Sequence, residues 1–142
     1  PDDIPDLPII MINGDVLTNV DFSRILDFHE KNDATATMCV REYEYQVPFG
    51  VINGSGNKIV SMVEKPVHRF FVNAGIYIID HMIKNLANKN ARVDMPTLLE
   101  RSIANGEDVF MFPIHEYWLD IGRLSDFEKA QVDIKNLDMS LK

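Results

Sequence analysis

At 142 residues, with 46% hydrophobic and 25% charged side chains, the sequence is typical of one soluble globular domain, which we expect to span residues 1–142. Lys and Arg number 14 against 22 Asp and Glu, a net charge of −8, and no basic cluster could follow a phosphate backbone. No apolar run approaches the roughly 20 residues of a membrane span. Neither a nucleic-acid partner nor a membrane is therefore expected. The single cysteine, Cys39, is typical of a small buried side chain in a reducing compartment, so we expect a cytoplasmic protein.

The first predicted strand is the apolar run Ile9–Ile12, which follows an extended N-terminal segment, residues 1–8. Such a run is typical of a strand buried on both faces of a helix-covered parallel sheet. The run stops at Asn13-Gly14-Asp15, and this leaves the carboxylate of Asp15 at the carboxyl end of the strand, where open α/β sheets bind ligands. The alternative is an ordinary turn that contains a helix cap.

A helix and a second strand follow. The segment Thr18–Asp21 matches a capping box, and the apolar spacing after it predicts a helix to about Lys31 with His29 packed on its apolar side. Residues Thr35–Arg41 are rich in β-branched side chains and predict the next strand. Together these segments predict a right-handed strand-helix-strand unit with parallel strands.

The middle of the chain predicts a hairpin over residues 49–64, around the glycine-containing turn Asn53–Asn57. At its end, Glu64 and Lys65 place a carboxylate beside an ammonium group, and Pro66 fixes the direction of the chain that follows. A surface charge pair, which would contribute little to stability, is the alternative interpretation.

A longer predicted strand, Phe71–Ile79, is interrupted by Asn73, Ala74 and Gly75. Small residues in the middle of a core strand leave room either for a ligand or for a bulge or a close backbone crossing. The remaining predicted elements are helices over 80–87, 94–105 and 125–134 and strands over 108–112 and 117–121.

The second of these strands ends as the first strand of the chain does, with an apolar run followed by an aspartate, Asp120. Magnesium in proteins keeps several waters and takes one or two carboxylates together with substrate phosphates. The shared context of Asp15 and Asp120 therefore predicts that both lie within reach of one Mg²⁺ ion.

Five motifs in this order resemble the sugar-1-phosphate nucleotidyltransferase family, which includes mannose-1-phosphate guanylyltransferases. The motifs are Ile12–Asp15, Phe49–Val51, Glu64–Pro66, Val72–Tyr77 and Trp118–Gly122. The resemblance covers the chain from about Pro8 to Ile134. It implies an α/β, Rossmann-like fold with a mixed, mainly parallel sheet and flanking helices. It also implies an enzyme, guanylyltransferase-like in our interpretation, that joins a sugar-1-phosphate to a nucleoside triphosphate (NTP) and releases pyrophosphate.

The resemblance further implies the roles of individual residues. Asp15 and Asp120 would hold Mg²⁺, and Lys65 would meet the phosphate of the sugar, so these three form the expected catalytic set. The expected substrate-binding residues are Gly50, Glu64, Lys65, Asn73, Ala74 and Gly75. Both reactants are anions, so the main requirements are positioning and charge neutralisation, and no covalent nucleophile is needed.

The chain also departs from the family pattern. Family members carry a glycine-rich triphosphate loop and a base-recognition segment before the Asn-Gly-Asp motif, and neither is found here. We therefore expect the chain to correspond to the second half of such an enzyme, to be inactive alone, and to form a homo-oligomer through its uncovered sheet edge. The alternatives are a non-catalytic sugar-phosphate-binding or regulatory module, a metal-dependent glycosyltransferase, and a merely structural α/β domain.

Overall fold

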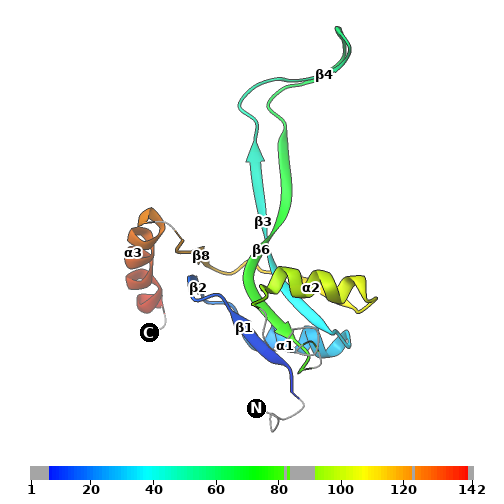
Figure 1. Ribbon diagram of the computed structural model, residues 1–142. Helices are drawn as coiled ribbons and strands as arrows, with labels where there is room; N and C mark the ends of the chain where they lie inside the picture. Colours follow the sequence, from blue (N-terminus) through cyan, green and yellow to red (C-terminus); the bar gives the residue numbers. More distant parts are fainter. Residues whose placement is uncertain (1–6, 82, 84–91, 123, 141–142) are drawn as a thin grey trace. The chain divides into compact units, whose positions relative to one another are not determined.

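The structure is a computed structural model that describes residues 7–81, 83, 92–122 and 124–140. Figure 1 shows a mixed α/β arrangement of helices and strands. In chain order the elements are β1 (Ile9–Ile12), β2 (Val16–Thr18), α1 (Phe22–Lys31), β3 (Ala36–Gln46), β4 (Val51–Ser55), β5 (Lys58–Val63), β6 (Val67–Ile79), α2 (Met95–Ala104), β7 (Val109–Pro113), β8 (Trp118–Asp120) and α3 (Leu124–Ser140).

The chain divides into two compact units, one formed by Pro1–Val40 with Asn73–Lys142 and the other by Arg41–Val72. Strands β3 and β6 each belong partly to both units, because the second unit begins within β3 and ends within β6. That residues 1–142 behave as a single domain stays a prediction.

The central sheet has four strands in the order β1-β6-β3-β7. Strand β1 pairs antiparallel with β6, whereas β3 pairs parallel with β7. The expected α/β fold with a mixed sheet is therefore confirmed. The first two predicted strands, β1 and β3, are not direct neighbours, because β6 lies between them.

Strand β1 is an edge strand, and its side chains are not buried on both faces. Ile10 is 41% exposed, Met11 39% and Ile12 47%. The expectation of two-sided burial is wrong for the described residues, because the sheet that they form ends at β1. Strand β6 is buried on both faces from Ala74 to Ile79, and β3 is largely buried from Ala36 to Val40.

Two hydrophobic clusters cover the two faces of β6. Ala74, Ile76 and Ile78 pack in one cluster with Ile25 of α1, whereas Tyr77 and Ile79 belong to the other. The second cluster includes Leu98 and Leu99 of α2. This alternation is the two-residue period of a strand, so helices α1 and α2 cover opposite faces.

Two expectations about buried polar groups are confirmed. Cys39 is fully buried in the cluster with α1, and burial raises the pKa of its thiol to about 12. His29 is also buried, its Nδ1 lies 2.9 Å from the Thr37 hydroxyl, and burial lowers the pKa of its imidazole.

The helix starts are confirmed at α2 but not at α1. Asp94, the first residue of the predicted helix 94–105, caps α2, its carboxylate accepting a hydrogen bond from the Thr97 amide. At α1 the cap is Asp21, whose side chain accepts from the Ser23 amide. Thr18 is not a cap, because it ends β2 and α1 begins only at Phe22.

The predicted helix over 80–87 lies largely outside the described residues, as does most of the N-terminal segment 1–8. Within the described part of the chain, no helix is long and apolar enough to span a membrane.

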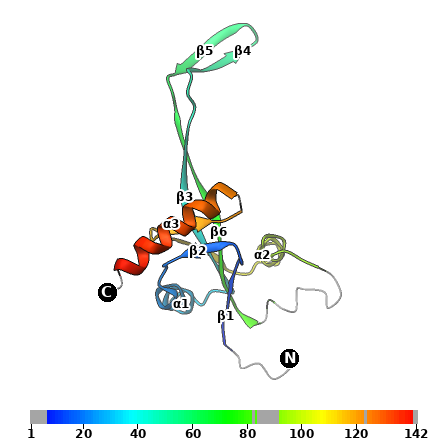
Figure 2. The same ribbon diagram turned by 90° about the vertical axis from the view of Figure 1, so that its left-hand side faces the viewer.

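The second unit contains the predicted hairpin. Strands β4 and β5 pair antiparallel (Figure 2) around a turn at Gly56 and Asn57, which is narrower than the predicted 53–57. Gly56 has a φ of +57°, a conformation that glycine adopts at little cost. No residue of 41–72 is buried, so this unit has no core of its own.

Candidate functional site

The backbone brings Asp15 and Asp120 to the same end of a short ladder. Strands β2 and β8 pair antiparallel with Val16 opposite Asp120, and the Ile121 amide donates to the Asp15 carbonyl at 2.7 Å. Both aspartates are exposed. Asp15 lies in the turn before β2, where the Val16 amide donates to the Asn13 carbonyl at 3.2 Å.

These two aspartates fit the requirements of Mg²⁺ better than those of a metal held by protein side chains alone. Among the described residues, no group of three or more His, Cys, Asp or Glu side chains could hold a metal ion. Magnesium needs only one or two carboxylates when water and phosphate oxygens complete its shell. The Oδ1 atom of Asp120 accepts from the Gly122 amide at 2.9 Å, which helps to orient this carboxylate.

The residues Asn73, Ala74 and Gly75 form an irregular step in β6. The Gly75 amide donates to Asn73 Oδ1 at 2.9 Å, and Asn73 Nδ2 donates to the Tyr77 hydroxyl at 2.7 Å. Gly75 has a φ of +70°, and a β-carbon there would lie 2.7 Å from Asn13 Nδ2. The close approach of Asn13 therefore favours glycine at position 75 for structural reasons alone. Its predicted role in sugar binding stays a prediction.

An indole hydrogen bond connects this step in β6 to the strand that carries Asp120. Trp118 Nε1 donates to the Ala74 carbonyl at 2.8 Å, and Ala74 is fully buried beneath it. Trp118 and Asp120 belong to the same short strand. The hydrogen bond from Trp118 therefore connects the strand of Asp120 to the predicted sugar-binding residues Asn73–Gly75.

A cleft of about 660 Å³ opens beside this step. It is lined by Asn13, Asn73, Tyr77, Arg92, Val93, Asp94, Met95 and Pro96. Its volume is in the range of small-molecule sites, and Asn73 and Tyr77 are the residues of β6 that line it. Of the residues predicted from the sequence, the cleft contains Asn73.

Sequence reasoning missed Asn13, Tyr77 and Arg92 as residues of this cleft. Asn13 belongs to the first motif and Tyr77 to the fourth, so the motifs held a signal for both. Arg92 falls between predicted elements, and only the fold brings it beside β6.

In the second unit, Gly50 and Glu64 are in contact. A β-carbon at residue 50 would lie 2.9 Å from Glu64 Oε2, so a glycine is what lets the carboxylate take this position. Both residues are exposed. The structure thus brings together two of the residues predicted to bind the sugar.

Lys65 has a backbone that lysine rarely adopts. Its φ is +45°, in the left-handed region, although Pro66 follows it. Such a conformation costs on the order of 1–2 kcal/mol and is often found at functional sites. Its carbonyl accepts a hydrogen bond from Gln46 Nε2 at 3.4 Å.

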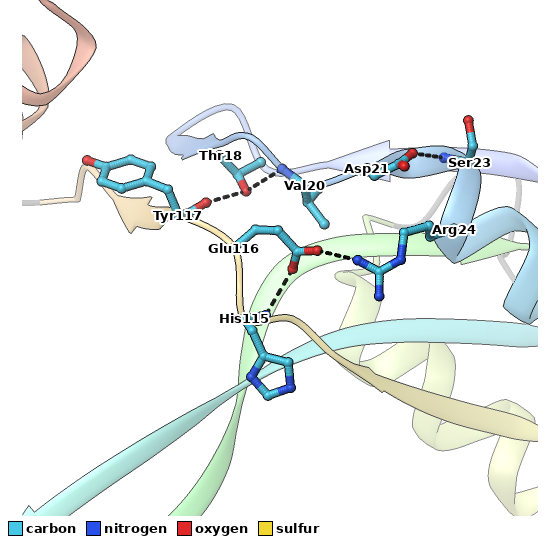
Figure 3. A network of polar contacts seen from close by, with 8 residues as sticks. All are labelled: Thr18, Val20, Asp21, Ser23, Arg24, His115, Glu116 and Tyr117. Carbon is cyan, nitrogen blue, oxygen red and sulfur yellow. Dashed lines mark hydrogen bonds and ion pairs between the residues drawn. The ribbon is translucent and has the colours of Figure 1, made fainter. Parts of the chain in front are cut away.

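The loop before β8 is tied to the start of α1 (Figure 3). The Thr18 hydroxyl donates to the Tyr117 carbonyl at 2.7 Å, and Arg24 Nη1 lies 2.8 Å from Glu116 Oε1. The other carboxylate oxygen of Glu116 accepts from the His115 amide. Further along, the Tyr117 hydroxyl donates to Asp133 of α3 at 2.6 Å.

Comparison with known proteins gives a family match over most of the chain. The model of the family described as nucleotidyl transferase matches residues 2–136. A mannose-1-phosphate guanyltransferase of Yarrowia lipolytica is 33% identical over 130 residues, which are 86% of this chain and 34% of that protein. A glucose-1-phosphate adenylyltransferase of Ruminiclostridium cellulolyticum is 27% identical, over 89% of this chain and 32% of that protein.

A solved structure shares the fold. It is a putative glucose-1-phosphate thymidylyltransferase from Bacillus anthracis in complex with a sucrose, and it has a TM-score of 0.64 at 18% identity. The similarity covers 92% of this chain and 56% of that one. The chain spans about a third of the length of the curated relatives described above.

Proposed function

Because the chain belongs to the nucleotidyl transferase family, we propose that it is part of an enzyme that makes a nucleoside-diphosphate sugar from a sugar-1-phosphate and an NTP. The name of the Yarrowia lipolytica relative leads us to favour mannose-1-phosphate and GTP as the substrates. The observation that carries the proposal is the β2–β8 ladder, which brings Asp15 and Asp120 to one end.

In the proposed reaction, a phosphate oxygen of the sugar-1-phosphate attacks the α-phosphorus of the NTP. The bond from that phosphorus to the β-phosphate breaks, and pyrophosphate leaves with the electron pair. Asp15 and Asp120 would hold Mg²⁺, which when bound neutralises charge on the phosphate oxygens. The protein groups position two anions and need not supply a nucleophile.

The remaining roles are those that the resemblance to the family implies. Glu64 would accept hydrogen bonds from sugar hydroxyls, with Gly50 leaving space for its carboxylate. The ammonium of Lys65 would offset the charge of the attacking phosphate. Asn73 would offer the substrate in the cleft the N–H that it does not donate to Tyr77.

Arg92 adds a cation that the sequence analysis did not assign. It is the one Lys or Arg among the described residues that line the cleft. In a chain with a net charge of −8, an anionic substrate needs local positive charge. We therefore assign Arg92 to substrate attraction at the cleft.

The 142-residue chain alone should bind a hexose-1-phosphate without turning it over. The chain spans about a third of its relatives' length, and we propose that contacts to the NTP base and triphosphate need residues other than those of this chain. Under this proposal, turnover belongs to the full-length protein of which the chain forms part.

The test is Mg²⁺-dependent pyrophosphate release by the full-length protein, with each hexose-1-phosphate paired with each NTP. We expect release with at least one pair, and a loss of at least about 100-fold in Asp120→Asn, because a charged ligand of the phosphate-bound ion is removed. Glu107→Gln, a carboxylate outside the ladder, is the matched control and should retain activity.

Other outcomes would favour the alternatives. Hexose-1-phosphate binding without pyrophosphate release from any pair would favour a non-catalytic binding module. Sugar transfer from a nucleotide sugar in the presence of the metal would favour a glycosyltransferase. Either result would contradict the proposed reaction.

A further inference from the structure

We propose that Thr18 is a positioning residue whose hydroxyl fixes the register of β8 on β2 and thereby sets Asp120 beside Asp15. This inference rests on the proposed function in one respect only, the use of the two aspartates for a divalent cation. The register itself is a property of the chain.

The ladder is too short to fix its own register. Strands β2 and β8 have three residues each, with Thr18, Leu17 and Val16 opposite Trp118, Leu119 and Asp120. Short two-stranded pairings are marginal in water. A slip of one residue would move Asp120 along the ladder and turn its side chain to the other face.

The Thr18 hydroxyl acts at the end of the ladder opposite to the aspartates. It donates to the Tyr117 carbonyl at 2.7 Å and accepts from the Val20 amide at 3.2 Å (Figure 3). It therefore ties the residue before β8 to the residue that ends β2. The Asn19 amide also donates to the Tyr117 carbonyl, but over a longer distance of 3.3 Å.

The helix cap that was predicted at Thr18 is found at Asp21. A capping threonine would accept from an amide at the start of α1, but that amide bonds to Asp21 instead. The O–H of Thr18 is a separate donor, and it donates to the Tyr117 carbonyl, 99 positions later in the chain.

The ion pair between Arg24 and Glu116, which also holds this loop, should matter less. The Arg24 side chain is 64% exposed and that of Glu116 is 23% exposed, so the arginine end of the pair lies largely in water. Exposed ion pairs contribute little because solvent screens them. A partly buried hydrogen bond to a main-chain carbonyl is the more effective constraint.

The variant Thr18→Val tests the inference, because valine keeps the shape and the β-branch but loses the hydroxyl. Thr18→Ser restores the hydroxyl, and Glu116→Gln is the matched control at the other tie. The first measurement is hydrogen exchange of the Ile121 amide, which bonds to the Asp15 carbonyl. The second is the affinity for Mn²⁺ alone, which is measured from the paramagnetic broadening of the NMR signals of Asp15 and Asp120.

In Thr18→Val we expect Ile121 exchange to be about two- to tenfold faster and Mn²⁺ affinity to fall by a similar factor. Global stability, measured by urea unfolding, should change less than in a core variant such as Ile76→Ala. Thr18→Ser should restore both values, and Glu116→Gln should change them less than about twofold.

Unchanged exchange and affinity in Thr18→Val would overturn the inference, as would equal effects of Thr18→Val and Glu116→Gln. A wild-type protein that binds no Mn²⁺ would contradict the metal site of the proposed function. In that case the Ile121 exchange rates still decide whether Thr18 sets the register.

Discussion

The carboxylate of Glu64 occupies space that a side chain at Gly50 would need, since Oε2 lies 2.9 Å from the position of a β-carbon there. Gly50→Ala should therefore displace the carboxylate. The displaced atom is the end of a flexible side chain, so stability should change little. If Glu64 binds sugar hydroxyls, hexose-1-phosphate affinity should fall by about 1–3 kcal/mol, measured by calorimetric titration.

Gly54→Ala is the matched control for this change. It lies in the same hairpin, and a β-carbon there meets the Lys58 carbonyl at 3.5 Å, an ordinary contact. We expect no change in affinity. Equal affinities of wild type and Gly50→Ala would argue that Glu64 does not contact the sugar.

Gly75 should tolerate alanine less well than Gly50 does. Gly75→Ala would be strained by a φ of +70° and by contact with Asn13, and should destabilise the protein by about 2–4 kcal/mol in urea unfolding. Gly106 has a φ of +80° with open space around it, so Gly106→Ala should cost only about 1 kcal/mol. Similar losses at the two positions would show that the Asn13 contact is unimportant.

Two substitutions of Lys65 separate the effect of its backbone strain on stability from the effect of its charge on binding. Lys65→Gly removes both the ammonium and the strain at φ +45°, and should be about 1 kcal/mol more stable than Lys65→Ala. Both variants should bind hexose-1-phosphate about 1.5–3 kcal/mol more weakly if the ammonium meets the phosphate. Lys58→Ala, at an exposed lysine of β5, should retain wild-type affinity. Losses below about 1 kcal/mol at Lys65 would return it to the status of a surface charge.

The hydroxyl of Tyr117 should ionise only at an unusually high pH. Burial, followed by the hydrogen bond to Asp133, raises the pKa of its hydroxyl to about 12 from a usual value near 10. Because the folded pKa is raised, the contribution of Tyr117 to stability is present below about pH 10 and is lost as the pH rises towards 12. A spectrophotometric titration should show one late tyrosine that is absent in Tyr117→Phe. An unchanged titration curve in that variant would contradict the assignment.

Among the described strands β1 has a neighbour on one side alone, so its outer edge should promote self-association by pairing with another chain. Met11→Lys places a charge on this edge and should shift light-scattering profiles towards the monomer. Val132→Lys, at an exposed residue of α3, is the control and should leave association unchanged. A strictly monomeric wild type at high concentration would count against the expected homo-oligomer.

Several features could be predicted from local sequence. The start of α2 at Asp94, the end of α1 at Lys31 and the hairpin around Gly56 all depend on caps, apolar spacing and glycine turns. These signals act over a few residues, so they are present in the sequence itself. The family motifs could also be identified from the sequence, because each is a short run of consecutive residues.

What the tertiary structure decided were the relationships between distant residues. The sequence identified Asp15 and Asp120, but only the pairing of β2 with β8 places their backbones together. It suggested that Thr18 caps a helix, whereas a carbonyl 99 residues away accepts its hydroxyl. It also indicated that β1 is buried, although burial depends on which strands lie beside it. Local propensity acts along a few residues of the chain, while register, burial and side-chain partners depend on which distant segments the fold brings together.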